Sequence, residues 1–257
     1  MDFGIAGRRA LVLGSTGGLG RAAAQRLADE GARVVVTGRR GEQARDLASP
    51  WPGSIGLEVD LTAADAVESL CAQVRDSVGA VDILVLNSPG PPPAPATDVD
   101  VTQITTALQT LLLRQVELVR AVLPGMREQK WGRIIGIGSS GIQAPLPNLA
   151  LSNTGRAALA AYLKTLAAET ASDGVTVNMV LPGRIATDRL AGLDQAAADR
   201  QGISSDEVAQ RSVATIPAGR YGRPEEFGAA VAFLASEGAG YITGVQLRVD
   251  GGLVRSN

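Results

Sequence analysis

The sequence contains no histidine and a single cysteine. Histidine is the usual general base near neutral pH and the commonest metal ligand, so acid–base chemistry falls to other side chains and no metal site is predicted. Cys71 lies in the helical-looking stretch VESLCAQV and has no second cysteine with which to form an intrachain disulfide. We interpret Cys71 as a small buried hydrophobe rather than a reactive thiol.

The chain also has little net charge and no long hydrophobic run. It carries 24 Lys and Arg against 26 Asp and Glu, which leaves neither a basic stripe for a nucleic acid nor a polybasic segment for an anionic membrane. We therefore expect neither a nucleic acid nor a membrane as a partner. No stretch approaches the length of a membrane span, and residues 1–14 lack the apolar region and cleavage site of a signal peptide. We therefore predict a cytoplasmic protein.

Hydrophobic residues, by contrast, are plentiful. They make up 45% of the 257 residues, enough to bury a sizeable core, and residues 1–257 are predicted to form one domain. Short runs rich in Val, Ile and Leu, bounded by Gly, Asp or Pro, are typical of strands buried on both faces. These runs are 9–14, 33–38, 54–60, 81–87, 132–139, 175–183 and 245–252.

Helical patterns lie between most of these strands, at 18–30, 41–49, 63–78, 103–129, 152–172 and 224–236. The repeated strand–helix–strand order implies a Rossmann-type, doubly wound α/β fold, with a parallel sheet of about seven strands and helices on both faces. In such a sheet, loops at the carboxyl ends of the strands line the ligand crevice. Ligand-binding residues are therefore expected directly after strands.

The first of these loops has the sequence LGSTGGLGRA. Gly14, Gly18 and Gly20 follow a strand and open a helix, where they allow a tight turn and a close approach of the backbone to a pyrophosphate. The alternative is a turn that only packs helix on sheet, but the second strand at 33–38 favours dinucleotide binding. Ser15 and Leu19 of the same loop are included among the candidate cofactor-binding residues.

The residues at the end of the second strand indicate whether that dinucleotide is NAD or NADP. An Asp or Glu there suits the 2′-hydroxyl of NAD, but this chain has Arg39 and Arg40. Guanidinium groups suit a 2′-phosphate, so NADP is predicted over NAD, with Arg39 as the contact. The alternative is that the two arginines only make a surface loop more soluble. NAD is therefore kept as a second possible cofactor.

Together these motifs resemble those of the short-chain dehydrogenase/reductases over essentially the whole chain, and segment 219–252 is close to that of 3-oxoacyl carrier-protein reductases. The stretches VDLT, LNSPG and VNMVLPGRIATDRL carry much of the resemblance. It implies further cofactor contacts, to the adenine and to the nicotinamide among others, at Asp60, Leu61, Asn87, Gly90, Pro182, Gly183, Ile185 and Thr187.

The resemblance breaks at the catalytic residues. It implies a serine at the end of a strand, which is Ser139, and then a tyrosine and a lysine four residues apart. Those two positions hold Ser152 and Arg156 in the stretch LSNTGRAAL, and the position of a fourth residue, an asparagine, holds Leu111. Ser139, Ser152 and Arg156 are therefore the candidate catalytic residues.

These replacements remove the usual proton donor. A phenol with a pKa of about 10 can protonate a developing alkoxide, whereas an aliphatic hydroxyl does not titrate comparably. Ser152 can still form a two-donor oxyanion site with Ser139, and a water can fill the remaining gap. Arg156 keeps the positive charge on the same helical face and can bind ribose hydroxyls, but it holds its proton too tightly to relay one.

Three hypotheses follow. The first is an NADPH-dependent reductase, acting on a 3-oxoacyl or related ketone, whose proton comes from a water or from an acidic group of the substrate. The second is a cofactor-binding homologue without redox turnover, a regulator or partner subunit. The third, a non-redox enzyme like the haloalcohol dehalogenases, is disfavoured because those keep the tyrosine and lose the Gly-rich loop. We favour the reductase.

Two regions outside these motifs also carry predictions. Arg184 and Arg189, in a lid-like loop around 184–215, indicate either an anionic small-molecule substrate or a solvated lid. The helices at 103–129 and 152–172 carry broad apolar stripes, and small residues on the second allow close approach. The resemblance implies that these helices pair into a homotetramer, with a dimer as the alternative.

Overall fold

The computed structural model describes residues 2–255 and places all seven predicted strands in one parallel sheet, in the order β3-β2-β1-β4-β5-β6-β7. The Rossmann-type fold predicted from the sequence is confirmed. The strands are β1 (Arg9–Val12), β2 (Arg33–Gly38), β3 (Ile55–Glu58), β4 (Ile83–Leu86), β5 (Gly132–Ile137), β6 (Val175–Pro182) and β7 (Gln246–Val249).

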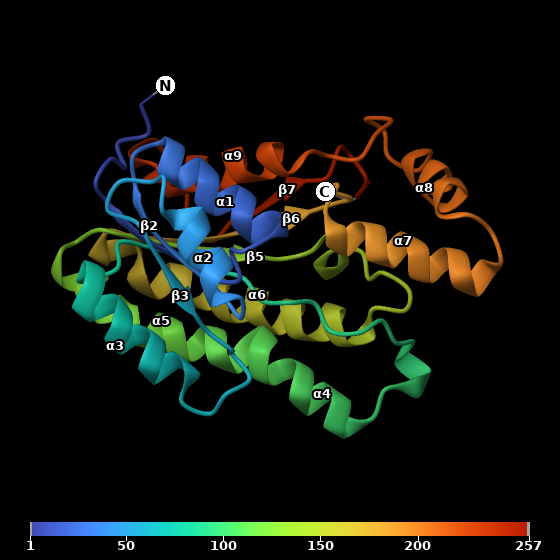
Figure 1. The fold of residues 1–257 in the computed structure, drawn as a ribbon, viewed down its shortest axis with the longest axis horizontal. Helices are drawn as coiled ribbons and strands as arrows, with labels where there is room; N and C mark the ends of the chain where they lie inside the picture. The colour runs from blue at the N-terminus through green and yellow to red at the C-terminus, as the bar shows by residue number, and fades with distance from the viewer. Residues whose placement is uncertain (1, 256–257) are drawn as a thin grey trace.

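Helices cover both faces of the sheet, because its central strands are apolar on both sides (Figure 1). Leu11 and Leu84 belong to one buried cluster, whereas their chain neighbours Val12 and Val85 belong to the other, as the alternation of side chains along a strand requires. The first cluster packs against α3 (Ala66–Val78), α5 (Arg114–Glu128) and α6 (Ala150–Thr170). The second packs against α1 (Gly18–Asp29), α2 (Gly41–Ala48) and α9 (Pro224–Ala235).

The helix predicted at 103–129 is interrupted. It consists of α4 (Val101–Leu108), a π-helical turn at Gln109–Leu113, and α5. The Gln115 side-chain amide donates to the carbonyl of Thr110 in this turn at 2.9 Å. Such π-turns often occur at functional sites, and this one contains Leu111.

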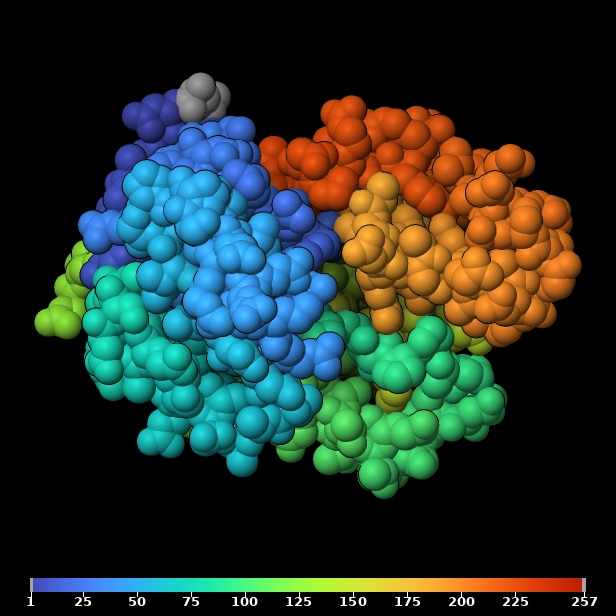
Figure 2. All heavy atoms as spheres, viewed as in Figure 1, coloured from blue at the N-terminus to red at the C-terminus, as the bar shows by residue number. Residues whose placement is uncertain are grey.

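The segment predicted as a lid-like loop around 184–215 holds two helices, α7 (Asp188–Gln201) and α8 (Ser205–Val213). Local capping explains why they form. The Thr187 and Ser204 hydroxyls accept from the amides of Leu190 and Glu207, and Gly202 ends α7 in the left-handed region. Figure 2 shows a hollow between the orange segment that holds α7 and α8 and the blue N-terminal part of the chain.

Among residues 2–255, no helix is both long enough and apolar enough to cross a membrane.

Candidate active site

A cleft of about 1200 Å³ opens at the carboxyl ends of the strands. It is lined by the loops that follow β1, β2, β3, β4, β5 and β6, and by parts of α6, α7 and α8, as expected for an open α/β sheet. Most residues predicted from the sequence line it. They are Gly14, Gly18, Leu19, Arg39, Asp60, Leu61, Asn87, Gly90, Ser139, Ser152, Arg156, Pro182, Gly183, Ile185 and Thr187.

The glycine loop forms a cradle at the start of α1. Gly14 and Gly18 have φ of +54° and +56°, which only glycine adopts readily. The first turn of α1 has no side-chain cap, so its amides are free to donate to an anion in the cleft. The Asn87 amide donates to the carbonyls of Leu13 and Gly14, both at 3.2 Å, and holds the loop in place. This geometry fits a pyrophosphate.

Two predicted cofactor residues do not line the cleft. A Cβ on Gly20 would lie 2.4 Å from the carbonyl oxygen of Gly14, so this glycine permits close packing of the loop on α1. Ser15 is 1% exposed; its hydroxyl donates to the Val12 carbonyl at 2.7 Å and accepts from the Thr37 amide at 2.9 Å. Ser15 therefore ties β1 to β2 instead of facing a ligand, and its sequence position within the loop gave no sign of that.

Exposed arginines border the cleft after β2. Arg40 donates to the Thr16 hydroxyl at 3.3 Å, so the second arginine is fixed against the glycine loop, a contact that the sequence alone did not reveal. After the neighbouring strand β3, Thr62 donates to the Asp60 carboxylate from its amide at 3.0 Å and its hydroxyl at 2.8 Å. These bonds, followed by the nearby charge of Arg39, lower the pKa of Asp60.

The three candidate catalytic residues converge at the other end of the cleft. Ser139 follows β5, and its hydroxyl accepts from the Gly141 amide at 3.0 Å. Ser152 and Arg156 are one turn apart on α6, and Arg156 Nε donates to Ser152 Oγ at 3.3 Å. Since that bond uses a lone pair of Ser152, its hydroxyl proton remains available for a ligand.

Arg156 is fixed by carbonyl groups and has no acidic partner among residues 2–255. Its Nη1 donates to the carbonyl of Ile137 at 2.8 Å and its Nη2 to that of Ser88 at 3.4 Å. Burial, together with the positive charge of Arg189, lowers the pKa of Arg156 to about 10. At neutral pH the guanidinium is still protonated, so it supplies charge and does not act as a base.

Leu111 packs against α6 at Gly155, the residue before Arg156. Its side chain is 1% exposed and packs on Gly155, where an added Cβ would lie 2.6 Å from Leu111 Cδ1. With Ala107 and Leu151 it forms a small apolar cluster beneath the start of α6. The position for which the resemblance implies an asparagine is therefore dry and nonpolar.

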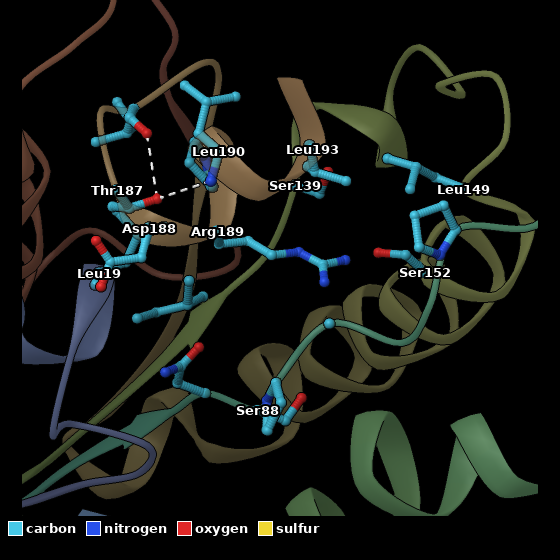
Figure 3. A pocket seen from close by; sticks show the side chains of 18 of the residues that line it. Leu19, Ser88, Ser139, Leu149, Ser152, Thr187, Asp188, Arg189, Leu190 and Leu193 are labelled. Atoms are coloured by element: carbon cyan, nitrogen blue, oxygen red, sulfur yellow. Dashed lines mark hydrogen bonds between the residues drawn. The ribbon is translucent and has the colours of Figure 1, made fainter. Parts of the chain in front are cut away.

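Thr187 links the loop after β6 to α7. Its hydroxyl donates to the carbonyl of Ile185 at 3.3 Å and accepts from the amide of Leu190 at 3.4 Å, the two bonds drawn in Figure 3. Ile185 is buried, and an isolated bridge joins it to Gly222. This loop is thus held from both sides where it borders the cleft.

The two lid arginines are in different environments. Arg184 lies 3.5 Å from the buried Asp194 carboxylate, which also accepts from the Tyr221 hydroxyl at 2.8 Å. Arg189 donates to the carbonyl of Pro91 at 2.9 Å, and its guanidinium points toward Ser152 (Figure 3). The structure therefore directs only one of the two toward the catalytic end.

Comparisons with known proteins agree with this geometry. A family model described as Enoyl-(Acyl carrier protein) reductase matches residues 14–254. The chain is 36% identical to the 3-oxoacyl-[acyl-carrier-protein] reductase FabG of Haemophilus influenzae over 252 residues, 97% of this chain and 99% of that protein. The chain belongs to the short-chain dehydrogenase/reductase family. The resemblance inferred from its motifs is confirmed.

Solved structures extend the family match. The L-sorbose reductase of Gluconobacter frateurii, complexed with NADPH and L-sorbose, superposes with a TM-score of 0.92 at 32% identity and covers 100% of both chains. YwfH, an NADPH-dependent reductase involved in bacilysin biosynthesis, has a TM-score of 0.91 at 28% identity and covers 98% of this chain and 100% of that one. Both family relatives are reductases described with NADPH.

Proposed function

We propose that the protein is an NADP(H)-dependent oxidoreductase that reduces a carbonyl, in a 3-oxoacyl group or a related ketone, at a Ser139–Ser152–Arg156 site. The observation that carries this proposal is one continuous cleft with a pyrophosphate cradle at one end and these three side chains at the other. Relatives that are 3-oxoacyl and NADPH-dependent reductases support it.

The family cofactor supplies a hydride when it is bound, and the residues present fit it. The free amides of α1 would hold the pyrophosphate and Arg39 with Arg40 the 2′-phosphate. The loop that Thr187 links to α7 would border the nicotinamide. The other residues proposed to contact the cofactor are Gly14, Gly18, Leu19, Asp60, Leu61, Asn87, Gly90, Pro182, Gly183 and Ile185.

The chain's own side chains would stabilise the developing oxyanion. Ser139 and Ser152 each present a hydroxyl to the cleft, and Arg156 places a fixed positive charge beside Ser152. Donors held in advance where negative charge develops are the largest single contribution in many enzymes. The proton then comes from a water in the cleft or from an acidic group of the substrate, since none of the three side chains titrates near neutral pH.

The test is loss of nicotinamide absorbance with acetoacetyl thioesters and β-ketoesters. We expect NADPH to be consumed slowly, and more slowly still after Ser139→Ala or Ser152→Ala, because each removes a donor to the oxyanion. Tight NADPH binding without turnover of any ketone would contradict the proposal. It would favour the second candidate, a cofactor-binding homologue without redox turnover, which the missing phenol and the apolar contact of Leu111 also favour.

Assembly as a homotetramer is also proposed. Ala157 and Ala161 are exposed on α6, and Leu113, at the start of the neighbouring helix, is 43% exposed. Small exposed residues beside an apolar side chain suit helix pairing. We expect light scattering at micromolar concentration to give a tetramer, and Ala161→Arg to reduce it to smaller species. A monomeric native protein would refute this.

The cytoplasmic location stays a prediction.

A further inference from the structure

Two arginines at the catalytic end of the cleft lack an acidic partner. Within residues 2–255, Arg156 contacts two carbonyls and the Ser152 hydroxyl, and the hydrogen bond of Arg189 is to the Pro91 carbonyl. Two other arginines of the same cleft are paired. Arg184 pairs with Asp194, and Arg211 pairs with Glu207 at 2.6 Å.

A cation that is buried without an acidic partner is unfavourable because burial removes hydration that no counter-charge replaces, and this is the environment of Arg156. Arg189 is exposed, but its positive charge repels that of Arg156 and contributes to the lowered pKa of Arg156. An anion bound between them would relieve both effects. Arginines with this environment are therefore expected to bind a negatively charged group.

The local structure brings the two guanidiniums together from different elements. Arg156 projects from α6, and Arg189 from the first turn of α7. Arg189 passes over Gly90, where an added Cβ would lie 2.8 Å from Arg189 Nη2. A side chain at position 90 would therefore require the guanidinium to move. Asp188 is also exposed in the cleft, but Figure 3 shows it near Leu19, on the side away from Ser152.

The cofactor is the other possible source of an anion. Its pyrophosphate fits the cradle at Gly14–Leu19, and its 2′-phosphate fits Arg39 and Arg40. In Figure 3 the Arg189 guanidinium points away from Leu19 and toward Ser152. An anion held by Arg189 would therefore lie at the end of the cleft that contains Ser152, and not at the cofactor cradle.

We propose that the substrate is a short oxo acid whose carboxylate binds between Arg156 and Arg189. This inference rests on the proposed reductase function, because the carbonyl is assigned to Ser139 and Ser152. A carboxylate matches the planar fork of a guanidinium. Since Arg156 Nε is 3.3 Å from Ser152 Oγ, the carboxylate and the carbonyl lie close together, as in a 2-oxo or 3-oxo acid and unlike a long acyl chain.

The experiment compares acetoacetate with its neutral methyl ester. Each is titrated by calorimetry into the full-length protein saturated with NADP⁺, so that binding is measured without reduction. We expect acetoacetate to bind at least about tenfold more tightly than the ester, because one charge-assisted contact contributes roughly that factor. Arg189→Gln and Arg156→Gln should each remove most of this preference. Arg189 is exposed, so its replacement leaves folding intact.

Arg200→Gln is the matched control. Arg200 lies on the same helix, α7, and in the same cleft, and it is exposed, so this variant removes an equal charge away from the proposed contact. It should keep the preference for acetoacetate. Equal affinities for acid and ester in the native protein, or a preference unchanged in both the Arg189 and Arg156 variants, would overturn the inference.

The remaining outcomes separate the possible causes. Weaker NADP⁺ binding in both variants, with the acid preference intact, would assign the two guanidiniums to the cofactor and overturn the inference. Reduction of the ester without a preference for the acid would refute this inference alone. Preferential binding of the acid, with neither compound reduced by NADPH, would support the anion site while refuting the reductase function.

Discussion

The double variant S152Y/R156K is expected to reduce methyl acetoacetate about 10²–10⁴-fold faster than the native protein, the usual contribution of a general acid. The tyrosine returns a phenol to the position for which the family resemblance implies one, and the lysine ammonium beside it lowers its pKa. NADPH affinity should change little, because the cradle at the start of α1 is untouched. Loss of nicotinamide absorbance measures the rate.

Two side chains decide how complete the gain is. The Arg189 guanidinium points toward Ser152 and must turn aside for a phenol, which its exposed position permits. Leu111 packs on Gly155, so L111N is needed in addition if the proton relay requires a polar group there. We expect L111N alone to destabilise the fold, because it places an amide in an apolar cluster.

A Ser139→Ala change in the repaired background should abolish the gain and show that it uses this site. A repaired variant that folds and binds NADPH but stays inert would show a cleft shaped for another ligand, and would favour the homologue without turnover. Brisk native turnover that is insensitive to Ser152→Ala and Arg156→Ala would mean that the active site is misplaced.

Replacing Arg39 and Arg40 with alanine is expected to weaken NADPH binding by about 1.5–3 kcal/mol for each charge-assisted contact that is lost, while leaving NADH binding nearly unchanged. The sequence singled out Arg39, but the structure places both arginines in the cleft and fixes Arg40 on Thr16. The double variant therefore gives the larger effect. Fluorescence titration with each cofactor measures it.

Arg21→Ala is the matched control, because it removes an exposed charge from α1 outside the cleft. It should alter neither affinity. Equal affinities of the native protein for NADPH and NADH would contradict the proposed NADP preference. So would an R39A/R40A variant in which both cofactors weaken equally, since only NADPH carries the 2′-phosphate.

The sheet was predictable because strands buried on both faces have near-continuous apolar sequences. β2 begins and ends where the pattern predicts, at Arg33–Gly38. The helices α7 and α8 were missed because they bury few side chains and their sequences are polar on average, although Thr187 and Ser204 are recognisable caps. The π-helical turn at Gln109–Leu113 has no periodicity that distinguishes it from a continuous helix.

At the site, short-range spacing predicted more than composition did. A separation of four residues placed Ser152 and Arg156 on one helical face, and the structure joins them by a hydrogen bond. Arg184 and Arg189 looked alike because both lie in one polar segment. Their difference depends on Asp194 and Pro91, partners that the chain brings close only when folded.

The contact between Leu111 and Gly155 has a kinetic consequence. Because Leu111 packs apolar atoms on Gly155, this position cannot pass on a proton as an asparagine side chain could. In a reductase that takes its proton from water in the cleft, that water both supplies the proton and exchanges with the departing product. A product that stays bound and displaces this water then slows the next proton delivery as well as the entry of the next substrate.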